Sequence, residues 1–134
     1  MAAHNDIGAY GEYLVMERLA QIAPVAPGSM ADVLFMNCEI EVKTARPSRY
    51  NGRHGDWGYQ FSLRRPGHSE VRAPVVVLVC LPLSSPEYTA FVIPADRLAG
   101  LAKVAVPLNV EEYAGLWAPY RERWEVIADF VGGN

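Results

Sequence analysis

The stretch EIEVKTA, residues 39–45, carries side chains that could do chemistry on one side of a strand. Strand side chains alternate between faces, so Ile40 and Val42 would face a core while Glu41 and Lys43 share the other face with a second acid. Carboxylates are hard oxygen ligands that suit Mg²⁺ or Mn²⁺. A lysine beside them could hold an attacking water or stabilise charge on a phosphate. The pattern indicates metal-assisted chemistry on a phosphodiester.

A second acid comes from the strand-like run ADVLFM, which precedes CEIEVKTA. The connection Asn37–Cys38 has the length of a tight hairpin. Facing residues would then have numbers that sum to 75, which places Asp32 opposite Lys43. A slip by one residue would bury Asp32 among apolar side chains, at the desolvation cost of an unpaired charge. The sequence therefore predicts both acids and the lysine on one face.

In this arrangement Asp32 and Glu41 are the candidate metal ligands, with the backbone carbonyl of Val42 as a further one. Lys43 beside two acids would stay protonated, because opposite charges favour its charged form. Cross-strand ion pairs are also common on exposed sheet faces. A solvated pair without chemistry is the alternative that the spacing leaves open.

A helix is predicted over residues 6–22, ahead of the hairpin. Its apolar residues recur at helical spacing: Ile7, Leu14, Val15, Leu19 and Ile22. Gly8 and Gly11 are poor helix formers and predict close packing of the first turns. Glu12 lies at the border of the apolar face, where it is either solvated or a third acid of the site.

The rest of the chain predicts an α/β domain with a mixed sheet. Residues 46–58 read as a long loop, and 59–63 as an ordered element of undecided type. Residues 73–81 have the continuous apolar character of a strand buried on both faces. The remaining elements are a neighbouring strand at 88–93, a short helix at 94–100, a helix from Asn109 that stops before Pro119, and an undecided segment at 123–130.

The bulk composition indicates one globular domain, residues 1–134. The formal charge is −3, yet residues 43–72 hold seven basic and two acidic residues, a balance of +5 that leaves −8 elsewhere. Such segregation can build a basic patch on an acidic protein. Candidates for contacts to a DNA backbone are Arg46, Arg49, Arg53, Arg64 and Arg65. A solvated arginine-rich loop without a partner is the alternative.

The sequence has neither a signal-peptide pattern nor an apolar run long enough to cross a bilayer, so we expect a cytoplasmic protein without a membrane partner. Cys38 and Cys80 lie in apolar runs and are expected to be reduced and buried.

Five segments together resemble the PD-(D/E)XK nuclease superfamily, over about residues 6–99: GAYGEYLVMERL, ADVLF, EIEVKTA, YQFSL and VVVLVCL…YTAFVIPADRL. The nearest members in arrangement are Holliday-junction resolvases and one class of intron-encoded homing endonucleases. The resemblance implies a restriction-endonuclease-like mixed central sheet flanked by helices. It also implies a Mg²⁺-dependent deoxyribonuclease that leaves a 5′-phosphate and a 3′-hydroxyl.

By this resemblance Asp32 and Glu41 would bind the metal and Lys43 would be the catalytic lysine. Glu12 matches a helix glutamate that touches the metal directly or through water, and Gln60 a glutamine that orients the site or contacts substrate. Cutting both strands of DNA requires two sites, so a homodimer is expected. The competing hypotheses are a catalytically silent nucleic-acid-binding or protein-interaction module on the same fold, and a purely structural partner of a larger complex.

Overall fold

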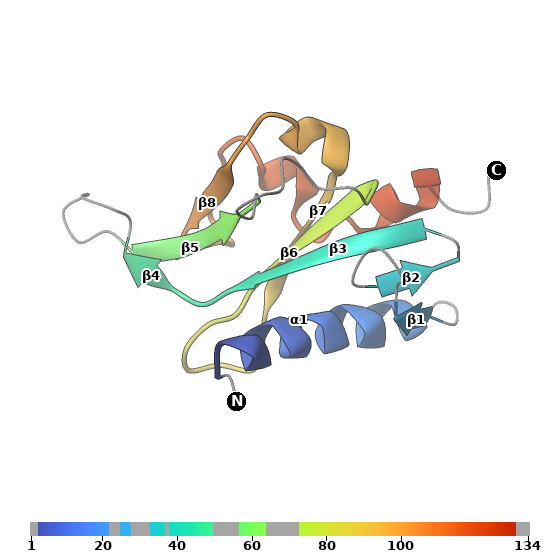
Figure 1. Cartoon of the computed structure of the whole chain (residues 1–134). Helices are drawn as coiled ribbons and strands as arrows, with labels where there is room; N and C mark the ends of the chain where they lie inside the picture. The colour runs from blue at the N-terminus through green and yellow to red at the C-terminus, as the bar shows by residue number, and fades with distance from the viewer. Residues whose placement is uncertain are drawn as a thin grey trace.

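The structure is a computed structural model that describes residues 3–21, 25–27, 33–36, 38–49, 57–63 and 73–130. Figure 1 shows the order of its elements along the chain. They are the helix α1 (Ala3–Ala20), the strands β1 (Val25–Pro27), β2 (Val33–Phe35), β3 (Cys38–Ala45), β4 (Ser48–Arg49), β5 (Trp57–Ser62), β6 (Val75–Cys80), β7 (Thr89–Pro94) and β8 (Lys103–Pro107), and the 3₁₀ helices η1 (Ala95–Leu98), η2 (Ala118–Tyr120) and η3 (Trp124–Phe130).

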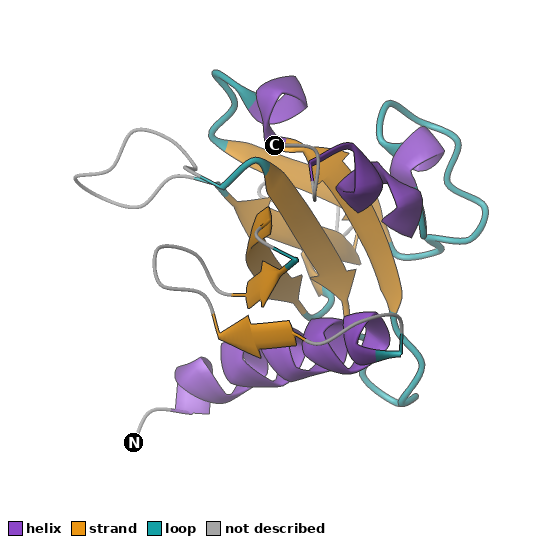
Figure 2. Ribbon diagram, turned by 90° about the vertical axis from the view of Figure 1, so that its right-hand side faces the viewer, coloured by secondary structure: helices purple, strands orange, loops and turns teal. Residues whose placement is uncertain are grey.

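Two sheets form the centre of the molecule. The larger has the strand order β1-β2-β3-β6-β7, in which β3 and β6 are parallel and the other neighbours are antiparallel. The smaller is antiparallel, with the order β4-β5-β8. Figure 2 shows α1 along one side of the strands; η3 packs in the same apolar cluster as α1, and η1 packs with β5 and β8 on the other face of the larger sheet. The predicted α/β class with a mixed sheet flanked by helices is confirmed.

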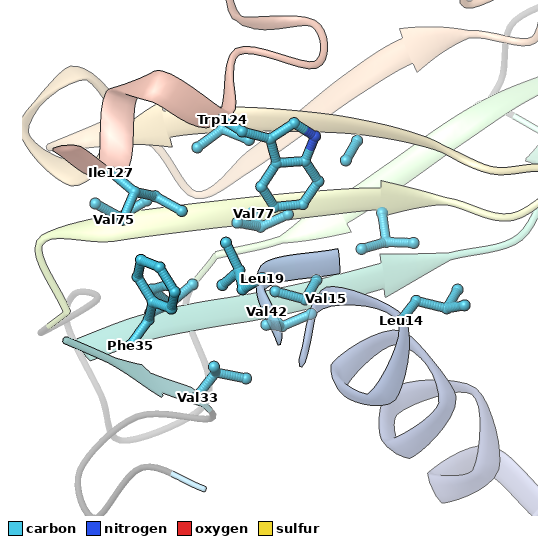
Figure 3. Packing of buried hydrophobic residues seen from close by; sticks show 14 of the residues in the cluster. Leu14, Val15, Leu19, Val33, Phe35, Val42, Val75, Val77, Trp124 and Ile127 are labelled. Atoms are coloured by element: carbon cyan, nitrogen blue, oxygen red, sulfur yellow. The ribbon is translucent and has the colours of Figure 1, made fainter. Parts of the chain in front are cut away.

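The strand β6 is the centre of the core, as its continuous apolar sequence predicts. All six of its side chains are buried. Alternate residues project to opposite faces, so Val75, Val77 and Val79 join one cluster and Val76, Leu78 and Cys80 join another. The first cluster contains the apolar face of α1, as Figure 3 shows for Leu14, Val15 and Leu19. The second lies between the larger sheet and the strands β5 and β8.

The helix α1 is confirmed with different ends: it begins at Ala3 and ends at Ala20. Of the two glycines that predicted close packing, Gly11 is buried, and a Cβ atom built there would meet the side chain of Thr44 on β3. For Gly8 the prediction is wrong: apart from its own helix backbone and chain neighbours, no atom of the described residues lies within 4 Å of a Cβ built there. No helix in the described part of the chain is long and apolar enough to cross a membrane.

The hairpin exists, but its predicted register is wrong by two residues. Val33 pairs with Ile40 and Leu34 with Glu39, so facing numbers sum to 73. Cys38 is already part of β3 and buried, and the turn includes Met36 at a φ of 49°. An even shift keeps every side chain on its face. The buried set Val33, Phe35, Ile40 and Val42 is therefore as predicted, while Asp32 lies outside the described residues.

Two further predictions differ from the structure, and one strand was not predicted. The helix expected from Asn109 is wrong: hydrogen-bonded turns follow that residue, and Pro119 lies inside η2. The strand β8 was not predicted, although its residues alternate between exposed and buried, with Val104 and Val106 inside. The segment 46–58 contains β4 and the start of β5, while 50–56 lies outside the described residues.

Hydrogen bonds at Glu122 join the chain after β8 to the backbone of β7. Glu122 has a φ of 52°, and its Oε2 accepts a hydrogen bond from the Ala90 amide at 2.8 Å. Its own amide donates to the Ala90 carbonyl at 2.7 Å, and the indole of Trp124 donates to its Oε1 at 2.9 Å. These bonds cover part of the outer edge of β7, a position where unpaired backbone groups are a hazard.

Both cysteines are free and buried, as expected. Burial, followed by the charge of Glu39, raises the pKa of Cys38 to about 11. Burial also raises the pKa of Cys80 far above its ordinary value, with a smaller contribution from the charge of Glu122. Both thiols therefore stay protonated at neutral pH, and they serve as small apolar core residues.

Candidate functional site

The second half of β3 lies beyond the residues of this strand that pair with β2. The strand β2 pairs with β3 only at Cys38, Glu39 and Ile40. From residue 41 to residue 45, β3 pairs with β6 on one side, and no described strand pairs with its other side. Residues 28–32, which precede β2, lie outside the described part of the chain.

Glu41 and Lys43 lie together on this stretch of β3. The Lys43 Nζ atom is 3.4 Å from Glu41 Oε2, and each side chain is only 19% exposed. Their cross-strand neighbours on β6 are Val76 and Leu78, both fully buried. The apolar surroundings keep the pair partly out of water, which strengthens its interaction with any other charged group that enters.

Glu12 is brought to the same stretch of β3 by a close helix–strand contact. Gly11 allows α1 to approach Thr44 more closely than any residue with a side chain would. Glu12 follows Gly11 in the helix, and Lys43 precedes Thr44 in the strand, so both flank the contact. Glu12 is half-buried. This contact lies on the Val42 face of β3, whereas Glu41 and Lys43 project from the opposite face, next to Val76 and Leu78.

Other members of the predicted metal site are only partly accounted for. Asp32 lies outside the described residues, and Val42 lies between Glu41 and Lys43 with its side chain buried towards α1. Within the described residues, no group of three His, Cys, Asp or Glu side chains could hold a metal ion. A metal site at Glu41 would therefore need a ligand from outside the described residues. Asp32 is the ligand that the sequence predicts, and it is one of those residues.

Gln60 joins two strands of the smaller sheet. Its Nε2 donates hydrogen bonds to Ser48 Oγ at 2.9 Å and to the Arg49 carbonyl at 2.7 Å. Its neighbours Tyr59 and Phe61 point into the core. Gln60 on β5 therefore holds β4, the short strand that contains Arg49.

Two of the predicted DNA-contacting arginines lie just beyond the carboxyl end of β3. Arg46 and Arg49 are both exposed. The parallel strand β6 ends beside them, since the Leu81 amide donates to the Ala45 carbonyl at 2.9 Å. The carboxyl ends of parallel strands are where open α/β sheets bind ligands. Arg53, Arg64 and Arg65 lie outside the described residues.

Among solved structures, a bacterial homing endonuclease, I-Ssp6803I, is similar to this chain over nearly its whole length. The TM-score is 0.68, and the match covers 96% of this chain and 95% of the other, at 15% sequence identity. The chain shares its fold with a homing endonuclease. No family model and no curated protein matches the sequence. The expected nuclease-like fold is confirmed, while membership of the PD-(D/E)XK superfamily stays a prediction.

Sequence reasoning missed a cavity of about 710 Å³ on this nuclease-like fold. It is lined by Pro47 and Trp57, by residues 82–85 and 87–89 after β6, and by residues 108–111 after β8. Two aromatic residues of β5, Trp57 and Tyr59, are among its lining residues. The cavity could not be predicted, because four separate segments of the chain build it: Pro47, Trp57 with Tyr59, the segment 82–89 and residues 108–111.

Proposed function

We propose that this protein is a metal-dependent DNA endonuclease whose active site is centred on Glu41 and Lys43. One observation carries the proposal: a carboxylate and an ammonium group lie 3.4 Å apart, partly buried, on the same face of β3. The fold that presents them is similar to that of a bacterial homing endonuclease.

The donor chemistry fits a hard divalent cation. Asp32, Glu41 and the carbonyl of Val42 would hold Mg²⁺ or Mn²⁺, which bind oxygen ligands, and Glu12 would contribute directly or through water. When bound, the ion supplies polarisation of the phosphodiester and lowers the pKa of water at the site.

The protein's own residues provide charge and orientation. Lys43 would donate hydrogen bonds to the attacking water or to a non-bridging phosphate oxygen, where negative charge grows. Its present partner, Glu41, keeps the ammonium group in place until the phosphate arrives. Arg46 and Arg49 would contact the DNA backbone, which positions DNA without reading sequence. Arg53, Arg64 and Arg65 would make further contacts to the DNA backbone.

Removal of divalent cations is expected to abolish cleavage. The measurement is conversion of supercoiled plasmid and of branched DNA to nicked or cut products, in buffers with Mg²⁺, with Mn²⁺ or with EDTA. Activity should be present with either ion and absent in EDTA, and it should return when the ion is added back. Cleavage that persists in EDTA after extensive chelation would refute the metal-dependent mechanism.

A second candidate is a nucleic-acid-binding module without turnover. Two observations favour it: Lys43 already pairs with Glu41, and the described residues contain no three-ligand metal group. In a gel-shift experiment such a module would bind DNA with the same affinity in Mg²⁺ and in EDTA. It would cut no substrate with either Mg²⁺ or Mn²⁺. A purely structural protein would show neither binding nor cleavage.

We also propose that the active species is a homodimer, since cutting both strands requires two sites. Light scattering during size-exclusion chromatography should give twice the 14.8 kDa mass of one chain. A mass of one chain, in the presence of DNA as well as in its absence, would limit the enzyme to nicking single strands.

A further inference from the structure

We propose that the 710 Å³ cavity binds an unpaired nucleobase of the DNA, with Trp57 as the stacking surface and Arg46 and Arg49 as phosphate contacts. The inference rests on the proposed function for its substrate, DNA. It adds a binding site distinct from Glu41 and Lys43. It also names the substrate class: DNA in which bases near the cut are unpaired, at a bulge, a branch or a single-stranded end.

The cavity has the size and position of a ligand site. Its volume lies within the range of about 300–1,000 Å³ that is usual for small-molecule pockets. It opens at the carboxyl ends of the parallel strands β3 and β6, where Pro47 and Pro82 follow the two strands. The third wall begins at Leu108, directly after Pro107, which pairs with Gly58 next to Trp57.

Trp57 is suited to stack on a base. It is 45% exposed, whereas Trp117 and Trp124 are each only 8% exposed. The guanidinium carbon of Arg49 lies 5.8 Å from the centre of the Trp57 ring, so the arginine orients the indole. An exposed aromatic ring beside an arginine is the arrangement that single-strand binders use for bases of any sequence.

Charges divide this surface into a part for the base and a part for the backbone. Glu87 and Glu111 line the cavity, and none of its described lining residues is Lys or Arg. A phosphate is therefore disfavoured inside it, while carboxylates accept hydrogen bonds from the amino group of a base such as cytosine. Arg46 lies in the adjoining hollow of about 360 Å³, which shares the wall formed by residues 82–85. The sugar-phosphate backbone would follow the arginines, with the base turned into the cavity.

The base site lies close to the proposed site of cleavage. Pro47 lines the cavity and is four residues from Lys43, so their Cα atoms are at most about 14 Å apart. A base in the cavity would thus belong to a nucleotide within a few positions of the phosphate at Lys43. This geometry predicts cuts at a fixed short distance from an unpaired base.

The test compares binding of a blunt duplex with binding of the same duplex carrying a bulge of unpaired cytosines, measured in EDTA so that no cleavage occurs. Trp57→Ala should weaken binding of the bulged duplex roughly 5- to 150-fold and leave the blunt duplex nearly unchanged. Tyr13→Ala is the matched control, because Tyr13 is a 56% exposed aromatic on α1 outside both hollows. It should bind both duplexes as the wild type does.

Fluorescence assigns the contact to Trp57 itself. The bulged duplex should quench wild-type tryptophan emission, and Trp57→Phe should retain most of the affinity but lose the quenching. A bulge of thymines should bind more weakly than one of cytosines, and the double substitution Glu87→Gln with Glu111→Gln should remove that difference. Equal effects of Trp57→Ala on both duplexes, or equal wild-type affinity for them, would overturn the inference.

The outcome is separable from that of the proposed function, which is measured as cleavage in Mg²⁺. Cleavage without preference for unpaired bases would leave the endonuclease standing and remove the base site. Binding of unpaired bases through Trp57 without any cleavage would support the base site and refute the endonuclease.

Discussion

Lys43→Ala is expected to lower the rate of Mg²⁺-dependent DNA cleavage by about 10²- to 10³-fold, the usual cost of removing one group that stabilises transition-state charge. The ammonium group lies 3.4 Å from the Glu41 carboxylate, and β3 contains no other basic residue. Because each side chain is only 19% exposed, loss of the pair should also lower stability, by more than the roughly 1 kcal/mol that an exposed pair contributes. Plasmid cleavage rates and urea unfolding of the same preparations measure the two effects separately.

The chain supplies its own matched control, since Lys103 is its other lysine. Lys103 is exposed on β8, so Lys103→Ala removes the same charge and should leave cleavage within about twofold of the wild type. Glu41→Gln tests the other half of the pair. Its loss should be partly reversed by high Mn²⁺, whereas that of Lys43→Ala should not. If Lys43→Ala and Lys103→Ala cut at the same rate, Lys43 is not catalytic.

Gly11→Ala is expected to destabilise the protein by about 1–3 kcal/mol, the typical cost of forcing extra atoms into a packed interface. The added methyl group would meet the Thr44 hydroxyl and lie 2.9 Å from Thr44 Cβ and 3.1 Å from its Cγ2, so α1 or β3 must shift. Such a shift would also move Glu12 relative to Lys43, and cleavage should fall with stability. Urea unfolding gives the free energy of unfolding.

Gly8 provides the comparison for this substitution within the same helix. A methyl group at Gly8 meets nothing within 4 Å. Gly8→Ala should therefore be neutral or stabilise the helix by up to about 1 kcal/mol, because alanine loses less backbone entropy than glycine. Thr44→Ala should be less harmful in the Gly11→Ala background than in the wild type, as expected for residues in contact. Equal stability of the two glycine variants would show that α1 and β3 do not pack as described.

Local patterns predicted the elements that carry the candidate site. The continuous apolar run 73–81 predicted a strand buried on both faces, and all six residues of β6 are buried. Alternation in EIEVKTA predicted that Ile40 and Val42 face the core, and they do. These features depend on periodicity within one segment, which the sequence displays directly. Glu41 and Lys43 were found in this way.

Other features depend on contacts between segments that the sequence does not relate to one another. The hairpin register follows from a turn that begins at Met36, although a turn one residue later fits the same apolar pattern. The strand β8 pairs with β5, which is distant from it in the sequence. In place of the helix expected after Asn109 there are turns and 3₁₀ helices, and Glu122, between η2 and η3, accepts a hydrogen bond from β7.

By itself, the sequence determined that this is an α/β chain with acidic and basic groups on one strand face, because side-chain alternation places them there wherever the strand lies. Only the tertiary structure decided that Gly11 packs on Thr44 and that Trp57 borders a cavity next to two arginines. Close approach and cavity shape arise from packing between distant segments, and short-range periodicity carries no information about which of them will meet.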